Sequence, residues 1–283
     1  MAEATPRTRR LGALLKQIRE DRGWSQAETA AKLGYKAVST VSKIENGTQA
    51  LTLQQLPHVF LVYELTDTLV QEELRDLVRR GNEPDYWERY GNVVSDLLNS
   101  YLVSIDTASR LFVWNPGVIH GLLQTPDYAR AIAQSTKVWT DEQLTGFVDL
   151  RLEHQEVALH RQPPLQVEVI LTEGILRQEV GGRSVMRAQV HHLVDLAHND
   201  PNITIQVIPF SAGAHAGVDG PFMYMTFPGG RDQVSIESTR AALQLTSKEE
   251  VEGYRNIKDL LQKDALTTAD STRVLASIAE DLA

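Results

Sequence analysis

Two short helical patterns around a glycine, within residues 25–47, constrain the fold of this chain most strongly. Ser25 and, three residues later, Glu28 form a capping box, which satisfies the free N–H groups at the start of a helix. Gly34 ends that helix, because glycine takes the left-handed conformation after a helix without steric cost. A second helix follows, and its spacing predicts three inward-facing apolar residues, Val38, Val41 and Ile44. Two short helices joined by a glycine corner are typical of a helix-turn-helix.

The second helix of this pair carries the side chains that DNA reading requires. Small polar side chains let a helix enter the major groove, and lysine reaches a phosphate or a base edge. We therefore predict that Ser39, Thr40 and Lys43 read bases. We predict that Gln26 clamps the preceding helix to a phosphate or an adjacent base. The other predicted DNA contacts, most of them to the DNA backbone, are Lys36, Val38, Ser42, Asn46 and Thr48.

Residues 10–63 resemble a helix-turn-helix domain of the lambda-repressor or Xre type. The resemblance rests on Gln26, on Leu33-Gly34 and on the run Val41-Ser42-Lys43-Ile44-Glu45-Asn46-Gly47. It implies an all-α head of five helices that works as a homodimer. Two such heads one helical turn apart would require a pseudo-palindromic operator in double-stranded DNA.

One feature departs from the family pattern. Six residues separate Gly34 from Val41, where the family usually has five. The extra residue either lengthens the turn or starts the recognition helix early. The sequence therefore leaves open which of Lys36, Val38 and Ser39 reach the bases.

The charge of the chain is divided unevenly along its length. The 283 residues carry a net charge of −9, yet residues 1–60 hold nine Lys or Arg against five Asp or Glu, a net +4. The remaining residues hold 19 basic and 32 acidic side chains, a net −13. Because phosphate contacts dominate DNA affinity, we expect that affinity to lie in the basic head. The acidic body suits a protein partner or a dimer contact.

Composition excludes several classes of protein. The chain has no cysteine, so it has neither a disulfide scaffold nor a Cys-ligated metal centre. We find no secretory signal and no apolar run near the ~20 residues of a membrane helix. We therefore expect a soluble cytoplasmic protein without a membrane partner, associated with the nucleoid when it binds DNA.

The sequence predicts two domains after a flexible arm at residues 1–9. The arginines at 7, 9 and 10 belong either to a solvated tail, which we favour, or to an arm that reaches phosphate or the minor groove. The helix-turn-helix domain is predicted over 10–81, with a helix near Pro57 that kinks or starts late. Gly81-Asn82-Glu83-Pro84 marks the boundary, and residues 85–283 form the second domain.

The second domain alternates helical and β-like segments. After an aromatic-rich stretch that leads into a helix through residue 98, we expect strands at 101–106, 111–114, 165–171, 203–209, 222–227 and 233–237. Helices are expected at about 126–135, 140–162, 184–199, 247–263 and 267–281. The apolar side of the 140–162 helix is expected in the core, with part of it in a dimer contact. This arrangement predicts an α+β domain with a mostly antiparallel sheet.

This second domain also resembles a known module. The run Gly121-Leu122-Leu123-Gln124-Thr125-Pro126-Asp127-Tyr128-Ala129-Arg130 is similar to the C-terminal domain of unknown function in actinobacterial Xre-type regulators of the Scr1/WhiJ-like kind. Further similar segments lie at 182–183, 186–189, 207–215, 220–222 and 236–237. The resemblance implies a transcriptional regulator, often encoded beside a small partner protein in an antitoxin-like pair. That partner is expected to engage the C-terminal domain.

Two segments of the second domain have side chains that can bind ligands. His191, Asp195 and His198 share one helix face, but a polar solvent-facing side is the better interpretation, so we predict no metal site. The glycine-rich loop 213–221 is favoured as a structural loop, with the lip of a ligand pocket or partner groove as the alternative. On that alternative the candidate residues are His215, Gly217 and Phe222.

The sequence therefore predicts a DNA-binding transcriptional regulator, a repressor, controlled through its C-terminal domain by a small partner protein. The alternatives are a repressor that senses a small molecule through a pocket in that domain, and the antitoxin of a toxin–antitoxin-like pair. No nucleophile elbow and no dinucleotide-binding or phosphate-binding loop is present, so we predict neither an enzyme nor a cofactor.

Overall fold

The computed structural model describes residues 5–81, 85–136, 139–228, 231–238 and 241–282. The chain divides into two compact units. The first comprises the described residues within Met1–Arg89, Val94–Thr107 and Pro228–Arg231. The second comprises those within Tyr90–Val93, Ala108–Phe227 and Asp232–Ala283.

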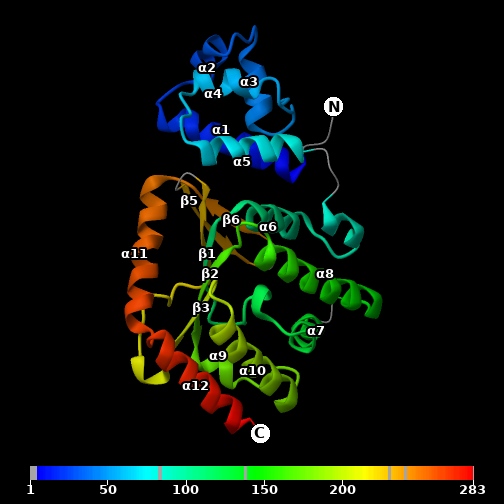
Figure 1. Ribbon diagram of the computed structural model, residues 1–283, viewed down its shortest axis with the longest axis vertical. Helices are drawn as coiled ribbons and strands as arrows, with labels where there is room; N and C mark the ends of the chain where they lie inside the picture. The colour runs from blue at the N-terminus through cyan, green and yellow to red at the C-terminus, as the bar shows by residue number, and fades with distance from the viewer. Residues whose placement is uncertain (1–4, 82–84, 137–138, 229–230, 239–240, 283) are drawn as a thin grey trace. The chain divides into compact units, whose positions relative to one another are not determined.

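The first unit is built mainly from helices (Figure 1). They are α1 (Pro6–Asp21), α2 (Gln26–Lys32), α3 (Val38–Glu45), α4 (Leu56–Val62), α5 (Thr68–Arg79), the 3₁₀ helix η1 (Tyr86–Tyr90) and α6 (Asp96–Thr107). The predicted capping box at Ser25 is confirmed, because its hydroxyl accepts from the Glu28 N–H and the Glu28 carboxylate accepts from the Ser25 N–H. Pro57 lies in the first turn of α4, so this helix starts late and does not kink there.

Helix α1 begins earlier than the sequence predicts. The Thr5 hydroxyl caps it by accepting from the backbone N–H of Thr8 at 3.2 Å. Residues 6–9, assigned above to the flexible arm, therefore form the first turn of α1, and Arg7 and Thr8 are buried. A terminal segment becomes ordered when its side chains are tied down in this way. Residues 1–4 of the predicted arm lie outside the described residues.

An apolar core joins α1 to α3, α4 and α5. Leu11, Leu14, Leu15 and Ile18 recur at i, i+3, i+4 and i+7 and form the buried stripe of α1. The other buried members of this core are Leu33, Ile44, Leu51, Leu56, Val59, Phe60, Tyr63, Val70, Leu74 and Leu77. This burial holds the two helices of the helix-turn-helix against α1.

The segment that follows α5 differs from the prediction. Residues 101–106, predicted as a strand, lie in helix α6, and the predicted helix through residue 98 is replaced by η1 and the start of α6. The run Tyr101–Ile105 is buried at every position, and a continuously buried run has no period that separates strand from helix. Helix α6 clusters with the first unit, beyond the boundary predicted from sequence. Residues 82–84 of that boundary lie outside the described residues.

The second unit contains a six-stranded sheet with the order β3-β2-β1-β4-β5-β6. The strands are β1 (Arg110–Trp114), β2 (Gln166–Thr172), β3 (Ile203–Ile208), β4 (Phe222–Phe227), β5 (Arg231–Glu237) and β6 (Ala242–Leu245). The pairs β1–β2 and β2–β3 are parallel, whereas β1–β4 and β5–β6 are antiparallel. The sheet is therefore mixed, and the prediction of a mostly antiparallel sheet is wrong.

The parallel pairs follow from the connections between the strands. Helices α7 (Pro126–Ser135) and α8 (Asp141–His160) lie between β1 and β2 in the chain. Helices α9 (Glu173–Arg177) and α10 (Arg183–Asn199) lie between β2 and β3. Parallel neighbours require such long crossovers, whereas a short turn joins antiparallel strands. The sequence revealed most of these helices but not which strands pair across them.

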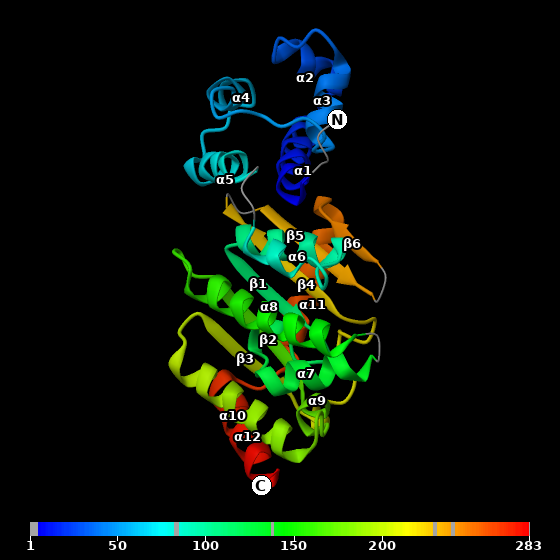
Figure 2. The ribbon, with the colours of Figure 1, turned by 90° about the vertical axis from the view of Figure 1, so that its right-hand side faces the viewer.

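Helices cover both faces of this sheet. In both views α7 and α8 lie over one face and α11 (Lys248–Asp264) over the other (Figures 1 and 2). Under α11, Phe112, Trp114 and Tyr224 pack with Val251 and Leu261. Helix α12 (Thr268–Asp281) packs against α10 and β3. The predicted helices at α7, α8, α10, α11 and α12 are confirmed to within a few residues, while α9 and β6 were not predicted.

Candidate nucleic-acid interface

Helices α2 and α3 are joined by a turn that centres on Gly34. Gly34 has φ of 72°, the left-handed conformation predicted for it. Helix α2 ends at Lys32 and α3 begins at Val38. Of the six residues between Gly34 and Val41, three therefore lie in the turn and three in the first turn of α3.

The predicted DNA contacts lie mainly on the exposed side of α3 and its flanks. Lys36, Val38, Ser39, Lys43, Asn46 and Thr48 are exposed, and Gln26, Thr40 and Ser42 are half-buried. Val41 and Ile44 are buried, as predicted. Val38 is 46% exposed, so the expectation that it faces inward is wrong. Its position in the first turn of α3 places it beyond the reach of the α1 core, and it stays among the predicted DNA contacts.

The end of α3 is fixed by two local hydrogen bonds. The Asn46 side-chain amide donates to the Ser42 hydroxyl at 3.4 Å. The Thr48 hydroxyl donates to the Lys43 carbonyl oxygen at 3.2 Å. Gly47 between them has φ of 71°, which favours glycine. Thr48, one of the predicted DNA contacts, is therefore held beside the end of α3.

Gln26 is held by a buried ion pair that the sequence did not predict. Its amide nitrogen Nε2 donates to Glu45 Oε2 at 2.7 Å. Arg19 donates through Nε and Nη2 to the two oxygens of the same carboxylate, at 2.6 and 3.1 Å. Arg19 and Glu45 are both buried. The one feature of the sequence that points to this ion pair is Glu45, an acidic residue in a helix whose other polar residues are uncharged or basic.

Helix α1 makes a close backbone contact with the end of α3. A Cβ atom at Gly12 would overlap the carbonyl oxygens of Ile44 and Glu45. A Cβ at Gly47 would lie 2.7 Å from the backbone nitrogen of Arg9. Glycine at both positions therefore lets the two helix backbones touch.

Two of the three N-terminal arginines bind carboxylates within the first unit. Arg7 pairs with Asp85 and Asp106, and Arg10 Nη2 lies 3.3 Å from Glu73 Oε1. Arg9 is exposed. The solvated tail favoured from the sequence is therefore wrong for Arg7 and Arg10.

The loop residues predicted as a ligand or partner site pack against the sheet. Trp114 Nε1 donates to the Gly217 carbonyl at 3.0 Å, and the Gly217 N–H donates to His215 Nδ1 at 3.2 Å. The His215 ring meets the buried Trp114 ring edge-on, with centroids 5.0 Å apart. Phe222 is buried between Phe112 and Tyr254. These contacts favour the structural interpretation of the loop.

An open groove of about 480 Å³ lies elsewhere in the second unit. The end of α10, strand β3 and the start of α12 line it, with His198, Asp200, Thr204 and Thr272 among the polar side chains. His191, Asp195 and His198 are exposed along α10. The described residues contain no group of three or more His, Cys, Asp or Glu side chains placed to hold a metal ion. Among the helices that the structure describes, none combines the length and apolar character needed to cross a bilayer.

The motif at 121–130 has a structural role in the second unit. Thr125 caps α7 by accepting from the Tyr128 N–H, and Gln124 Nε2 donates to the Ile119 carbonyl at 2.7 Å. Gln189 of α10 binds the same loop, accepting from the Thr125 N–H and donating to the Leu123 carbonyl, both at 2.7 Å. Gln189 is fully buried. The residues of this motif are therefore tied to one another and to α10 by buried hydrogen bonds. The sequence alone could not show which residues form these bonds.

Comparison with known families assigns both parts of the chain. A helix-turn-helix family model matches residues 15–56, which run from the second half of α1 to the start of α4. A second model, described as a domain of unknown function (DUF5753), matches residues 101–277. Comparisons with curated proteins and with solved structures gave no match. The chain therefore belongs to the DUF5753 family and carries a helix-turn-helix domain of the Xre-like kind at its N-terminal end.

Proposed function

We propose that this protein is a sequence-specific DNA-binding transcriptional regulator. The observation that carries the proposal is the exposed polar and basic side of α3, with Ser39 and Lys43, mounted on a helix whose opposite side is buried against α1. A recognition helix needs this combination of a rigid base and free polar side chains. Ser39, Thr40 and Lys43 read bases in this proposal, and Gln26 binds phosphate or an adjacent base.

The proposal extends to a homodimer that represses a pseudo-palindromic operator. A small protein encoded nearby binds the C-terminal domain and controls DNA binding, in an actinobacterial Scr1/WhiJ-like system that includes antitoxin-like pairs. The net −13 of residues 61–283 supports a protein partner for this part of the chain. The proposal includes no catalytic activity and no cofactor, and it places the protein in the cytoplasm.

A small molecule is the second candidate for the controlling signal. The open groove of about 480 Å³ beside α10 and α12 favours it, because residues with hydroxyl, imidazole and carboxylate groups line it. A ligand that binds this groove would raise the melting temperature of the full chain in proportion to the logarithm of its concentration. Absence of any shift across a metabolite panel would leave the protein partner as the signal.

Selection from random double-stranded DNA tests the proposed DNA binding. The full chain should enrich a two-fold symmetric motif, and its affinity for that motif should fall steeply between two salt concentrations because phosphate contacts release counterions. Lys43→Ala and Thr40→Ala should each lose the enriched motif or relax it at one position. Enrichment of no motif at either salt concentration would overturn sequence-specific DNA binding.

A further inference from the structure

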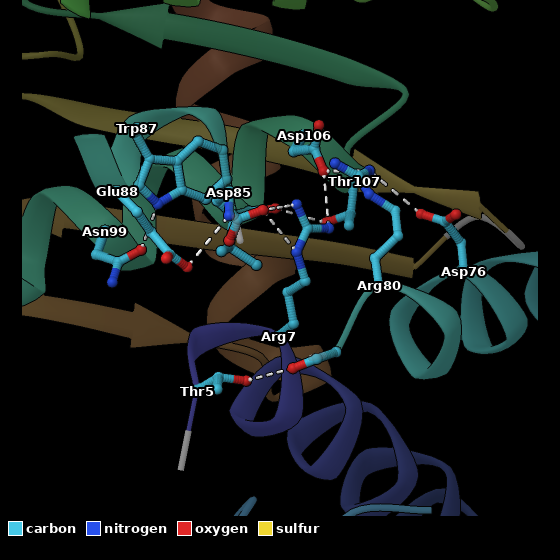
Figure 3. Close-up of polar contacts among 12 residues, drawn as sticks. Thr5, Arg7, Asp76, Arg80, Asp85, Trp87, Glu88, Asn99, Asp106 and Thr107 are labelled. Atoms are coloured by element: carbon cyan, nitrogen blue, oxygen red, sulfur yellow. Dashed lines mark hydrogen bonds and ion pairs between the residues drawn. The ribbon is translucent and has the colours of Figure 1, made fainter. Parts of the chain in front are cut away.

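Arg7, in the first turn of α1, is enclosed by carboxylates from two later segments (Figure 3). Its guanidinium donates from Nε to Asp85 Oδ1 at 2.8 Å and from Nη1 to Asp106 Oδ2 at 3.1 Å, and Nη2 also contacts Asp85. Only 1% of Arg7 is exposed. Asp85 directly precedes η1, and Asp106 lies in the last turn of α6.

Neighbouring contacts draw the end of α5 and the aromatic η1 segment into the same cluster. Arg80, which caps α5, donates to Asp106 Oδ2 at 2.8 Å. The Arg7 guanidinium lies 5.7 Å from the centre of the Trp87 ring, and Trp87 Nε1 donates to Asn99 of α6 at 2.8 Å. Four segments of the first unit therefore meet at Arg7 (Figure 3).

Because the Arg7 guanidinium is buried, the groups that surround it must keep their positions. A guanidinium removed from water is tolerated only when carboxylates and hydrogen bonds replace its hydration. Two carboxylates from separate segments must therefore stay in place around Arg7. The position of α1 is in this way fixed against η1 and α6.

The same helix fixes the recognition helix. Gly12 lets the α1 backbone touch the last carbonyl groups of α3, and Arg19 binds Glu45 of α3 through both carboxylate oxygens. Since α helices are stiff over a few turns, a shift at the Arg7 end of α1 would move these contacts as well.

We propose that Arg7 is a positioning residue for DNA recognition, and that η1 and α6 are part of the DNA-binding unit. This inference rests on the proposed DNA binding. Arg7 acts by placing α1, and through it α3, and not by touching phosphate. Only Ala108 and Ser109 separate α6 from β1, so the DNA-binding unit continues almost directly into the first strand of the C-terminal sheet.

The test compares Asp106→Asn with Glu72→Gln in the full chain. Each variant removes one negative charge from the first unit, which by itself strengthens attraction to DNA. Glu72 lies at the surface, where it pairs with Arg75 at 2.6 Å and its side chain is 66% exposed. Asp106→Asn should weaken binding to the selected DNA motif roughly 3- to 30-fold, although the loss of a negative charge by itself would strengthen it. Glu72→Gln should bind the motif at least as tightly as the unaltered chain.

Salt dependence separates positioning from direct contact. Arg7→Gln removes the guanidinium charge, and because a positioning residue neutralises no phosphate, the affinity of this variant should fall with an unchanged slope of log K against log salt. A slope lower by about one would show that Arg7 contacts a phosphate and would overturn the inference. Binding by Asp106→Asn equal to that of Glu72→Gln would overturn it too.

Hydrogen exchange in the DNA-free chain tests the positioning role of Arg7 separately from the proposed DNA binding. Asp106→Asn should speed amide exchange in α3 as well as in the first turn of α1, whereas Glu72→Gln should change neither. Faster exchange limited to the first turn of α1 would show that the constraint stops there and would overturn the inference. If the unaltered chain selects no DNA but exchange in α3 responds, the DNA-binding proposal fails while the link between Arg7 and α3 holds.

Discussion

The Arg19 guanidinium donates to both carboxylate oxygens of Glu45, at 2.6 and 3.1 Å, and so ties α1 to the last turn of α3. The Gln26 amide donates to the same carboxylate at 2.7 Å. One acidic side chain on the recognition helix therefore orients the first residue of α2. This arrangement couples the predicted phosphate clamp to the helix that we propose reads bases.

Glu45→Gln should destabilise the first unit by about 3–5 kcal/mol, because it removes the buried counter-charge of Arg19 and leaves only the exposed Glu20 carboxylate beside that guanidinium. Denaturant unfolding of the full chain, followed by circular dichroism, measures the change. Glu72→Gln is the matched control, and loss of its exposed pair should cost about 0–1 kcal/mol. Equal destabilisation by the two variants would show that the buried pair adds nothing beyond a surface contact.

Lys43→Ala should weaken binding to the selected motif by about 1–3 kcal/mol and relax the preference at one base position. Lys43 is exposed on the second turn of α3, where a long side chain can reach a base edge. Lys16→Ala on α1 is the charge-matched control, and it should preserve the motif. Uniform weakening across all sequences, with a salt slope lower by about one, would instead make Lys43 a phosphate contact.

Gly12→Ala should destabilise the first unit by about 1–3 kcal/mol, because the added methyl group overlaps the carbonyl oxygens of Ile44 and Glu45 and forces α1 away from α3. The control is Gly253→Ala in α11, where a Cβ meets nothing within 4 Å. That variant should be stabilised by roughly 0.5–1 kcal/mol through helix propensity. Thermal unfolding compares the two, and stabilisation by both would contradict the close packing of α1 on α3.

The second unit should lose stability as the pH falls from about 6.5 toward 3. Burial lowers the pKa of His154 to about 3, with the positive charge of Arg151 as a second cause. Between pH 3 and pH 6.5 the unfolded chain binds a proton at His154 that the folded chain does not, so each pH unit costs about 1.4 kcal/mol. The free energy of unfolding against pH, measured in denaturant, gives the sum of this slope and that of His120, whose pKa burial also lowers to about 3.

His154→Gln should flatten that slope by close to one proton. His198→Gln, at an exposed position on α10, serves as the control. An unchanged slope in the His154 variant would show that His154 is protonated in the folded state as readily as in the unfolded one.

Local signals predicted the helix ends well where capping is strong. Helix α7 has its predicted bounds. The Thr125 hydroxyl caps its first turn, and the proline ring of Pro126 fixes φ at a helical value. Helix α6 was predicted in part as a strand, because Tyr101–Ile105 is buried on every side and its pattern has no period. Ser25 and Gly34 define the helix-turn-helix by the same local rules, and the structure confirms both.

The amino-acid sequence by itself determined the helix-turn-helix, the order of most helices and strands, and the polar side chains that α3 exposes, but not the exposure of Val38. These features depend on caps, glycine conformations and periodicity within a few residues of each other. Only the tertiary structure decided that β1, β2 and β3 run parallel, that Arg7 is buried between Asp85 and Asp106, and that Glu45 binds Arg19 and Gln26. Each of these contacts joins residues far apart in the chain. Strand pairing and the burial of charged side chains depend on which helices and strands come into contact in the fold. A local pattern of residues does not contain that information.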